Sequence, residues 1–139
     1  MIYHGNRITM KKDATEEQIE IAMESLRNQG RAIPAVKSFV VGRDFGGEFE
    51  VGAVFVLEDL DGYWEYLMHP AHANTDRVGL PLVEKFDSFD ITDEDDPDFG
   101  AKIAELHKRR YAQDAELTQM VADLPAYSGS AAPGRHGAE

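Results

Sequence analysis

The sequence predicts an α+β fold in which helices cover one face of a single sheet. Three observations indicate it. Residues Ile2–Met10 alternate between apolar and polar side chains, as a strand with one buried face does. A helix-start composition follows at 13–18, and further strand-like apolar runs lie at 36–42, 49–57 and 84–91. With a second helix before the last run, the order is strand, helix, strand, strand, helix, strand. This is the ferredoxin-like order, with both helices on one sheet face.

The first strand carries polar residues on its buried face. His4 and Asn6 share that face with Ile2, Ile8 and Met10. Two polar side chains on an otherwise apolar face are either hydrogen-bonded within the core or line a pocket. The strand alone leaves both interpretations open.

The first helix has clear end signals. Thr15 and Gln18 have the spacing of a capping box. We expect the helix to reach about Gln29, with Gly30 forming a left-handed C-terminal turn. Its predicted buried stripe consists of Ile19, Ala22, Met23 and Leu26.

The run at 49–57 is apolar on both faces in its middle, because Val54 and Val56 alternate with Ala53 and Phe55. Helices would cover one side of such a strand. A partner subunit is the expected cover for the other side, which predicts a homodimer that buries the helix-free sheet face.

Two histidines, two tyrosines and the single tryptophan lie within residues 63–72. Leu60–Met68 reads as a short helix that Pro70 ends, so Tyr66 falls in its last turn and His69 and His72 follow. Imidazole and phenol close together can move protons near neutral pH. Equally, a His-Pro turn can serve only to terminate a helix. Residues 73–82 are expected to form a loop with a short helical turn.

The C-terminal part reads as an extension. Acidic residues fill 93–98; they lack the spacing of a calcium-binding EF-hand loop, so a helix-capping linker is expected, with Pro97 in the first helical turn. The apolar spacing in residues 99–124 predicts one long helix, whose charged centre is expected to be exposed to solvent. Residues 126–139 are predicted to be disordered. No role is assigned to His107 or His136.

Composition limits the function. The chain has 139 residues, 42% of them hydrophobic, which suits one domain with a core. It has no cysteine, and no apolar run approaches membrane-spanning length. A net charge of −12 disfavours nucleic-acid and membrane-surface partners. The first residues lack a signal-peptide pattern, so a cytoplasmic location is expected.

Several of these features together resemble the stress-responsive A/B barrel family, also called the Dabb or dimeric α+β barrel family. They are the opening Ile2-Tyr3-His4, the segment 33–37 (IPAVK), a strand followed by Glu58, and the run from Tyr66 to His72 that contains HPAH. The resemblance covers residues 1–92. It leaves 93–125 as acidic linker and C-terminal helix and 126–139 as a tail.

Within the family, the motif is most similar to olivetolic acid cyclase-like polyketide cyclases. The resemblance implies that Tyr66 and His72 form the acid–base pair of an aldol-type ring closure, and that His4 lines the same pocket. Another pocket histidine of those cyclases corresponds to Val51 here. Aromatic helix positions of those cyclases correspond to Ala22, Met23 and Leu26, which implies a pocket of different shape.

Two functions are therefore expected as alternatives. One is a cofactor-independent cyclase, isomerase, lyase or decarboxylase acting on a small carbonyl or aromatic, polyketide-like compound. The other is a non-catalytic homodimeric stress-responsive or small-molecule-binding protein. The predicted catalytic residues are His72, Tyr66 and His4; the predicted substrate-binding residues are Asn6, Ile8, Met23, Leu26, Val51, Ala53, Trp64 and His69.

No metal and no cofactor are expected. A zinc ion held by His4, His69 and His72 is the weaker third idea. Pro70 makes it hard to aim both motif histidines at one ion, and no acidic partner is evident around them.

Overall fold

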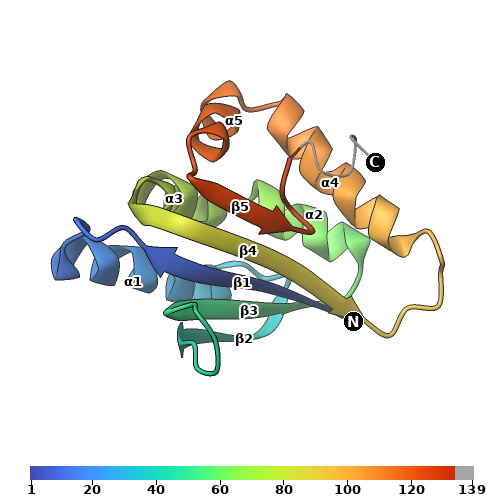
Figure 1. The fold of residues 1–139 in the computed structure, drawn as a ribbon. Coiled ribbons are helices and arrows are strands. Elements are labelled where there is room, and N and C mark those ends of the chain that lie inside the picture. Colours follow the sequence, from blue (N-terminus) through green and yellow to red (C-terminus); the bar gives the residue numbers. More distant parts are fainter. Residues whose placement is uncertain (134–139) are drawn as a thin grey trace.

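The computed structural model describes residues 1–133, which form one sheet with helices packed on it (Figure 1). The five strands are β1 Ile2–Met10, β2 Val36–Arg43, β3 Val51–Leu57, β4 Val83–Thr92 and β5 Ala126–Gly129. The helices are α1 Glu16–Ala32, α2 Leu60–Met68, α3 Pro70–Gly79, α4 Phe99–Ala112 and α5 Ala115–Ala122, with a 3-10 turn at Leu80–Leu82.

The sheet has the order β2-β3-β1-β4-β5. The central strand β1 is antiparallel to both β3 and β4, whereas β5 runs parallel to β4 at the edge. Helices α1, α2 and α3 lie on one face of the sheet, behind it in the view of Figure 1. The predicted ferredoxin-like α+β fold is confirmed, with β5 as an addition.

Helix α1 begins as predicted and ends later than predicted. The Thr15–Gln18 capping box is present, but the helix continues through Gly30 to Ala32. Gly30 does not adopt positive φ. It is small for another reason, since a Cβ there would lie 2.2 Å from the ring of Phe39 on β2. The prediction of a left-handed turn at Gly30 was therefore wrong. Close packing against Phe39 explains the glycine instead.

The segment after Pro70 is a helix rather than the expected loop. His69 ends α2 and also caps α3, its Nδ1 accepting a hydrogen bond of 3.0 Å from the backbone N–H of Ala71. Pro70 occupies the first turn of α3, where a missing N–H costs nothing. The proline thus ends one helix and starts the next, which carries His72 inward.

The C-terminal extension differs most from expectation. The predicted long helix breaks at Gln113 and Asp114 into α4 and α5, and Asp114 caps α5. Residues 126–129 form β5, so the prediction of disorder is wrong for 126–133; residues 134–139, including His136, lie outside the described part. The charged centre is exposed at Lys108, Arg109, Gln113 and Asp114, as predicted, but Arg110 within it is buried.

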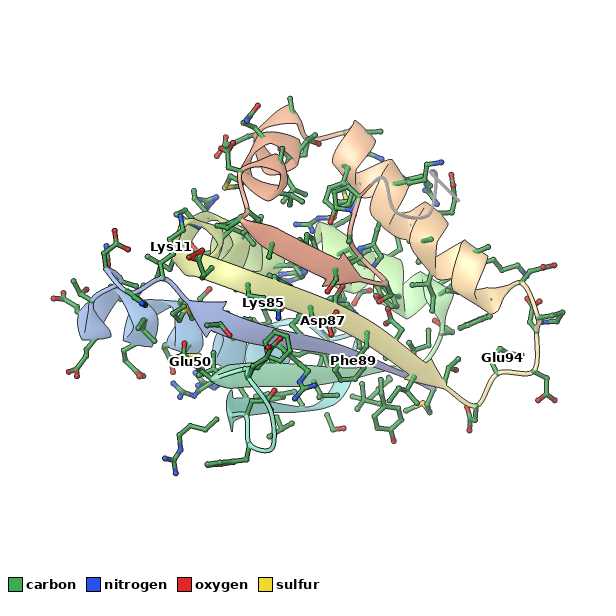
Figure 2. All side chains as sticks on the ribbon, in the orientation of Figure 1. Lys11, Glu50, Lys85, Asp87, Phe89 and Glu94 are labelled. Atoms are coloured by element: carbon green, nitrogen blue, oxygen red, sulfur yellow. The ribbon has the colours of Figure 1, made fainter. Side chains whose placement is uncertain are left out.

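Within residues 1–133, the other face of the sheet carries no helix. Along β4, Lys85, Asp87 and Phe89 lie on this open face (Figure 2). The ring of Phe89 rests over Gly5, where a Cβ would lie 2.1 Å from it. Ile91 is 63% exposed there. In residues 1–133, no helix combines the length and apolarity that crossing a bilayer requires.

Candidate functional site

A cavity of about 70 Å³ lies between the sheet and its helices. Strands β1 and β4 form its floor, and helices α1, α2 and α3 form its sides. The C-terminal extension closes it with residues from α4, α5 and β5. Its walls are mostly apolar, including Ile8, Leu26, Val83, Phe86, Leu117 and Val121.

Three of the predicted residues meet at this cavity from three different elements. His4 comes from β1, Tyr66 from α2 and His72 from α3. The rings of Tyr66 and His72 are edge to face with centroids 4.7 Å apart, and the His4 ring is 5.7 Å from Tyr66. His72 reaches the cavity because α3 starts at Pro70, which puts it in the first turn. A buried cluster of imidazole and phenol groups results.

His72 is held in a charged environment on α3. Its Nδ1 lies 3.2 Å from Oδ2 of Asp76, one turn later, although the two are out of line for a hydrogen bond. Arg110 of α4 forms an ion pair with the same carboxylate. Burial, and then the charge of Arg110, lower the pKa of His72 below its ordinary value. At neutral pH the imidazole is therefore uncharged and able to accept a proton.

Asp76 remains ionised in this environment. Burial alone raises the pKa of its carboxyl, but the neighbouring His72 and Arg110 outweigh burial and hold that pKa below its ordinary value. Of these two partners, Arg110 is the one that carries its charge at neutral pH.

Tyr66 offers the cavity an unused hydroxyl group. The side chain is fully buried, and its hydroxyl has no hydrogen-bond partner among the described residues. Burial, followed by the negative charge of Asp76, raises the pKa of Tyr66. The phenol therefore stays protonated and can donate a hydrogen bond.

A second polar cluster lies beneath the first and is centred on Tyr63 of α2. The Tyr63 hydroxyl lies 2.8 Å from Nδ1 of His4 and 2.8 Å from Nε2 of His107. It lies 3.0 and 3.1 Å from the carboxylate oxygens of Asp90, which is itself 3.0 Å from Nδ1 of His4. In one consistent arrangement, His4 and Tyr63 both donate to Asp90, and His107 donates to Tyr63.

In this second cluster, Asp90 is ionised at neutral pH, whereas His107 and Tyr63 are uncharged. Burial lowers the pKa of His107 to about 3. Burial, and then the Asp90 carboxylate, raise the pKa of Tyr63 far above its usual range. Burial also raises the pKa of Asp90, but His4 and Ser130 outweigh it, so that the pKa is lowered overall. Asp90 thus orients His4, whose ring lines the cavity.

The second cluster also contains residue types that bind metal ions. Ligand atoms of His4, Asp90 and His107 lie within 4.8 Å of one another. The Tyr63 hydroxyl, however, lies within hydrogen-bond distance of all three. Hydrogen bonding accounts for the cluster without an ion. The zinc alternative also lacks support, because His4, His69 and His72 are not among the described groups whose ligand atoms lie close enough to share an ion.

The other predicted binding residues fall into two groups. Asn6, Ile8 and Leu26 line the cavity beside the three residues above. Met23, Val51 and Ala53 instead pack in the main core, because the cavity lies over β1 and β4 and not over β3. Trp64 packs on that core as well, with the guanidinium of Arg109 4.3 Å from its ring, and His69 caps α3.

Among the lining residues that sequence reasoning missed, those that matter most for the chemistry of the cavity are Gln29, Asp76, His107 and Arg110. Asp76 follows His72 by four residues, a spacing that would have been informative had 70–79 been recognised as a helix. His107 and Arg110 lie in a charged segment that was taken for a solvated face. No local signal singles out Gln29.

Comparison with known proteins agrees with the fold. A family model described as the Stress responsive A/B Barrel Domain (Dabb) matches residues 2–93. None of the curated proteins matches the chain closely enough to count as a relative.

Solved structures match about two thirds of the chain. A dimeric ferredoxin-like protein of unknown function from Thermobifida fusca has a TM-score of 0.60 and 24% identity, over 66% of this chain and 89% of its own. Hydroxynitrile lyase from Passiflora edulis has a TM-score of 0.59 and 16% identity, over 67% of this chain and 94% of its own. A mutant of SnoaB, a cofactor-independent oxygenase from Streptomyces nogalater, has a TM-score of 0.54 and 15% identity, over 69% of this chain and 96% of its own. At these identities the likeness concerns the fold alone.

Proposed function

Since the chain belongs to the stress-responsive A/B barrel (Dabb) family, we propose that it is a cofactor-free enzyme acting on a small carbonyl compound by acid–base chemistry. The observation that carries the proposal is the convergence of a neutral His72 and an unpartnered Tyr66 hydroxyl on one largely apolar cavity in the described part of the chain. Two proteins of similar fold, a hydroxynitrile lyase and a cofactor-independent oxygenase, are enzymes.

The proposed first step is proton abstraction next to a carbonyl group. His72 takes the proton of the C–H bond, and the electron pair of that bond moves into an enolate whose oxygen becomes negative. Tyr66 donates a hydrogen bond to this oxygen. The imidazolium formed then returns its proton to carbon or to a leaving group. Asp76 stabilises the imidazolium, as a carboxylate beside a catalytic histidine does.

His4 has a supporting role in this proposal. Its Nδ1 is engaged with Asp90 and Tyr63, which orients the ring toward the ligand. The cavity size favours compounds smaller than a polyketide chain, because 70 Å³ corresponds to roughly five water-sized groups.

Deuterium exchange tests the chemistry without knowledge of the natural substrate. Small ketones are incubated with the protein in D₂O, and loss of the signal of the protons next to the carbonyl is followed by NMR. His72→Ala should lower the exchange rate by about 10²- to 10⁴-fold, the usual contribution of a positioned base. Tyr66→Phe keeps the ring and should cost less. If exchange is no faster than in buffer for every ketone tried, the proposed enzymatic activity is refuted.

The alternative is a non-catalytic binding protein. One observation favours it: His69 and Pro70 are fully explained by ending α2 and starting α3. In that case the wild type would bind small ketones without exchanging their protons. His72→Ala and Tyr66→Phe would then alter melting temperature and leave ligand binding unchanged.

We also propose that the protein is a homodimer joined through the open sheet face. Exposed apolar side chains gather there, including Tyr3, Val40 and Ile91. Such a patch is uncommon on a monomer. The cavity lies on the opposite, helix-covered side, so each subunit would hold a site made from its own residues.

A further inference from the structure

Gln29 is an unexplained residue of the cavity. It lies near the end of α1, is 2% exposed, and its Oε1 has no hydrogen-bond partner among the described residues. Buried acceptors without partners are rare in folded proteins, because they lose their hydrogen bonds to water and gain nothing.

The neighbouring polar residue on the same helix face shows the usual situation. Ser25, one turn earlier, shares a hydrogen bond of 2.7 Å with Thr75 and accepts another of 2.9 Å from Asn74. The contact between α1 and α3 therefore satisfies its own polar groups. Gln29 is the exception, and it lines the cavity.

The buried side-chain atoms that lack a hydrogen bond in the described part of the chain all belong to residues that line this cavity. In residues 1–133, the buried side-chain atoms without hydrogen bonds are Oε1 of Gln29, the hydroxyl of Tyr66 and Nδ1 of His72. They come from α1, α2 and α3, and all three residues line the same cavity. His72 has Asp76 close by, which leaves Gln29 and Tyr66 as an acceptor and a donor that a ligand could satisfy together.

Charge narrows the kind of ligand. Arg110 is paired with Asp76, so its charge is already balanced. The lowered pKa values of His72 and His107 keep both rings neutral at neutral pH. The pair of His4 with Asp90 has no net positive charge in either protonation state of the histidine. Among the described residues, the cavity lining therefore offers an anion no unbalanced positive charge.

We propose that Gln29 is a specificity-determining residue that accepts a hydrogen bond from the hydroxyl group of a small, neutral hydroxycarbonyl ligand, while Tyr66 donates to the carbonyl oxygen. This identifies a substrate class for the proposed function and rests on it. The small cavity volume favours a ligand of about five non-hydrogen atoms.

A matched pair of ketones tests the proposal. Hydroxyacetone and butanone have the same number of non-hydrogen atoms, and a hydroxyl in the first replaces a methyl in the second. Titration followed by protein NMR should show that the wild type binds hydroxyacetone about tenfold more tightly than butanone, because only the hydroxyl satisfies Oε1. Glycolate, an anion of similar size, should bind more weakly than either ketone.

Substitution of Gln29 gives the second measurement. Gln29→Met keeps a long side chain and removes the acceptor, so the preference for hydroxyacetone should disappear while the melting temperature stays the same or rises. A glutamine with a purely structural role would lower the melting temperature when replaced. Asn28→Met, at the adjacent exposed position of α1, is the control and should keep the preference.

Each outcome bears on the proposal. Equal wild-type affinity for the two ketones, a preference that Gln29→Met retains, or tighter binding of glycolate would overturn it. The wild-type comparison decides by itself if Gln29→Met does not fold. If the protein catalyses proton exchange equally for both ketones, the proposed enzymatic function holds and the proposed role of Gln29 is refuted. If the protein prefers hydroxyacetone but catalyses no exchange, the role of Gln29 holds and the enzymatic function is refuted.

Discussion

Acid destabilisation of this protein should depend strongly on one buried histidine. His107 of α4 is 5% exposed and faces Tyr63 from α2, His4 from β1 and Asp90 from β4. Burial lowers its pKa from 6.5 to about 3, and the charges of His4 and Arg110 add to this against the opposing effect of Asp90. Folding therefore keeps His107 unprotonated well below the pH at which the unfolded chain protonates it.

The sign follows from comparing the two states. Between about pH 6.5 and 3 the unfolded state binds a proton at this histidine and the folded state does not, so stability falls as the pH falls. The stabilisation is complete above about pH 6.5. Lowering the pH from about 7 to 5 should cost about 2 kcal/mol from His107 alone. His72, whose pKa is also lowered, adds a loss of the same sign.

The carboxylates act in a different range. The pKa values of Asp76 and Asp90 are lowered from 3.8, so the stability that they contribute is present above that value and is lost only in stronger acid. The loss between about pH 7 and 5 is therefore assigned to the histidines.

Chemical denaturation at the two pH values measures the effect. His107→Gln keeps a side-chain N–H for Tyr63 and does not titrate, so its unfolding free energy should fall by about 2 kcal/mol less than that of the wild type. Lys108→Gln, at the next and exposed position, should reproduce the wild-type loss. Protein concentration is kept constant because a dimer would unfold in a concentration-dependent way. Equal losses in wild type and His107→Gln would refute the reasoning.

Two further predictions concern the helix cap and the open face. His69→Ala removes the cap of α3 and should lower stability by about 1 kcal/mol, whereas His69→Asn should keep most of it; thermal unfolding measures both, and proton exchange equally lowered in both variants would contradict a purely capping role. Light scattering at micromolar concentration should report a dimer that Ile91→Glu dissociates. Ile21→Glu, at a comparably exposed isoleucine on α1, should leave it intact, and a monomeric wild type would contradict the prediction.

Much of the fold follows from local patterns that depend on nearest neighbours in the chain. The alternation in Ile2–Met10, the Thr15–Gln18 capping box and the doubly apolar strand β3 each predicted an element that the structure contains. The sequence also indicated the stretch containing Tyr66 and His72, because aromatic and titratable residues are unusually dense there.

Local patterns were misleading where a residue is explained by a distant contact. Gly30 looked like a helix end, but the ring of Phe39 requires the glycine. Pro70 looked like a stop, but it also begins the helix that carries His72 to the cavity. Arg110 looked solvated, but Asp76 from a different helix neutralises it inside the protein.

The sequence by itself determined the family, the order of strands and helices in the ferredoxin-like core, and the presence of His4, Tyr66 and His72 near one another. Only the tertiary structure decided that the extension after residue 93 closes the cavity, that His107 joins His4 and Asp90 around Tyr63, and that Gln29 has no partner for its Oε1 within residues 1–133. The physical reason is that helix and strand periodicities reflect the immediate surroundings of a residue. Burial, pKa and hydrogen-bond satisfaction depend instead on which distant segments pack against it.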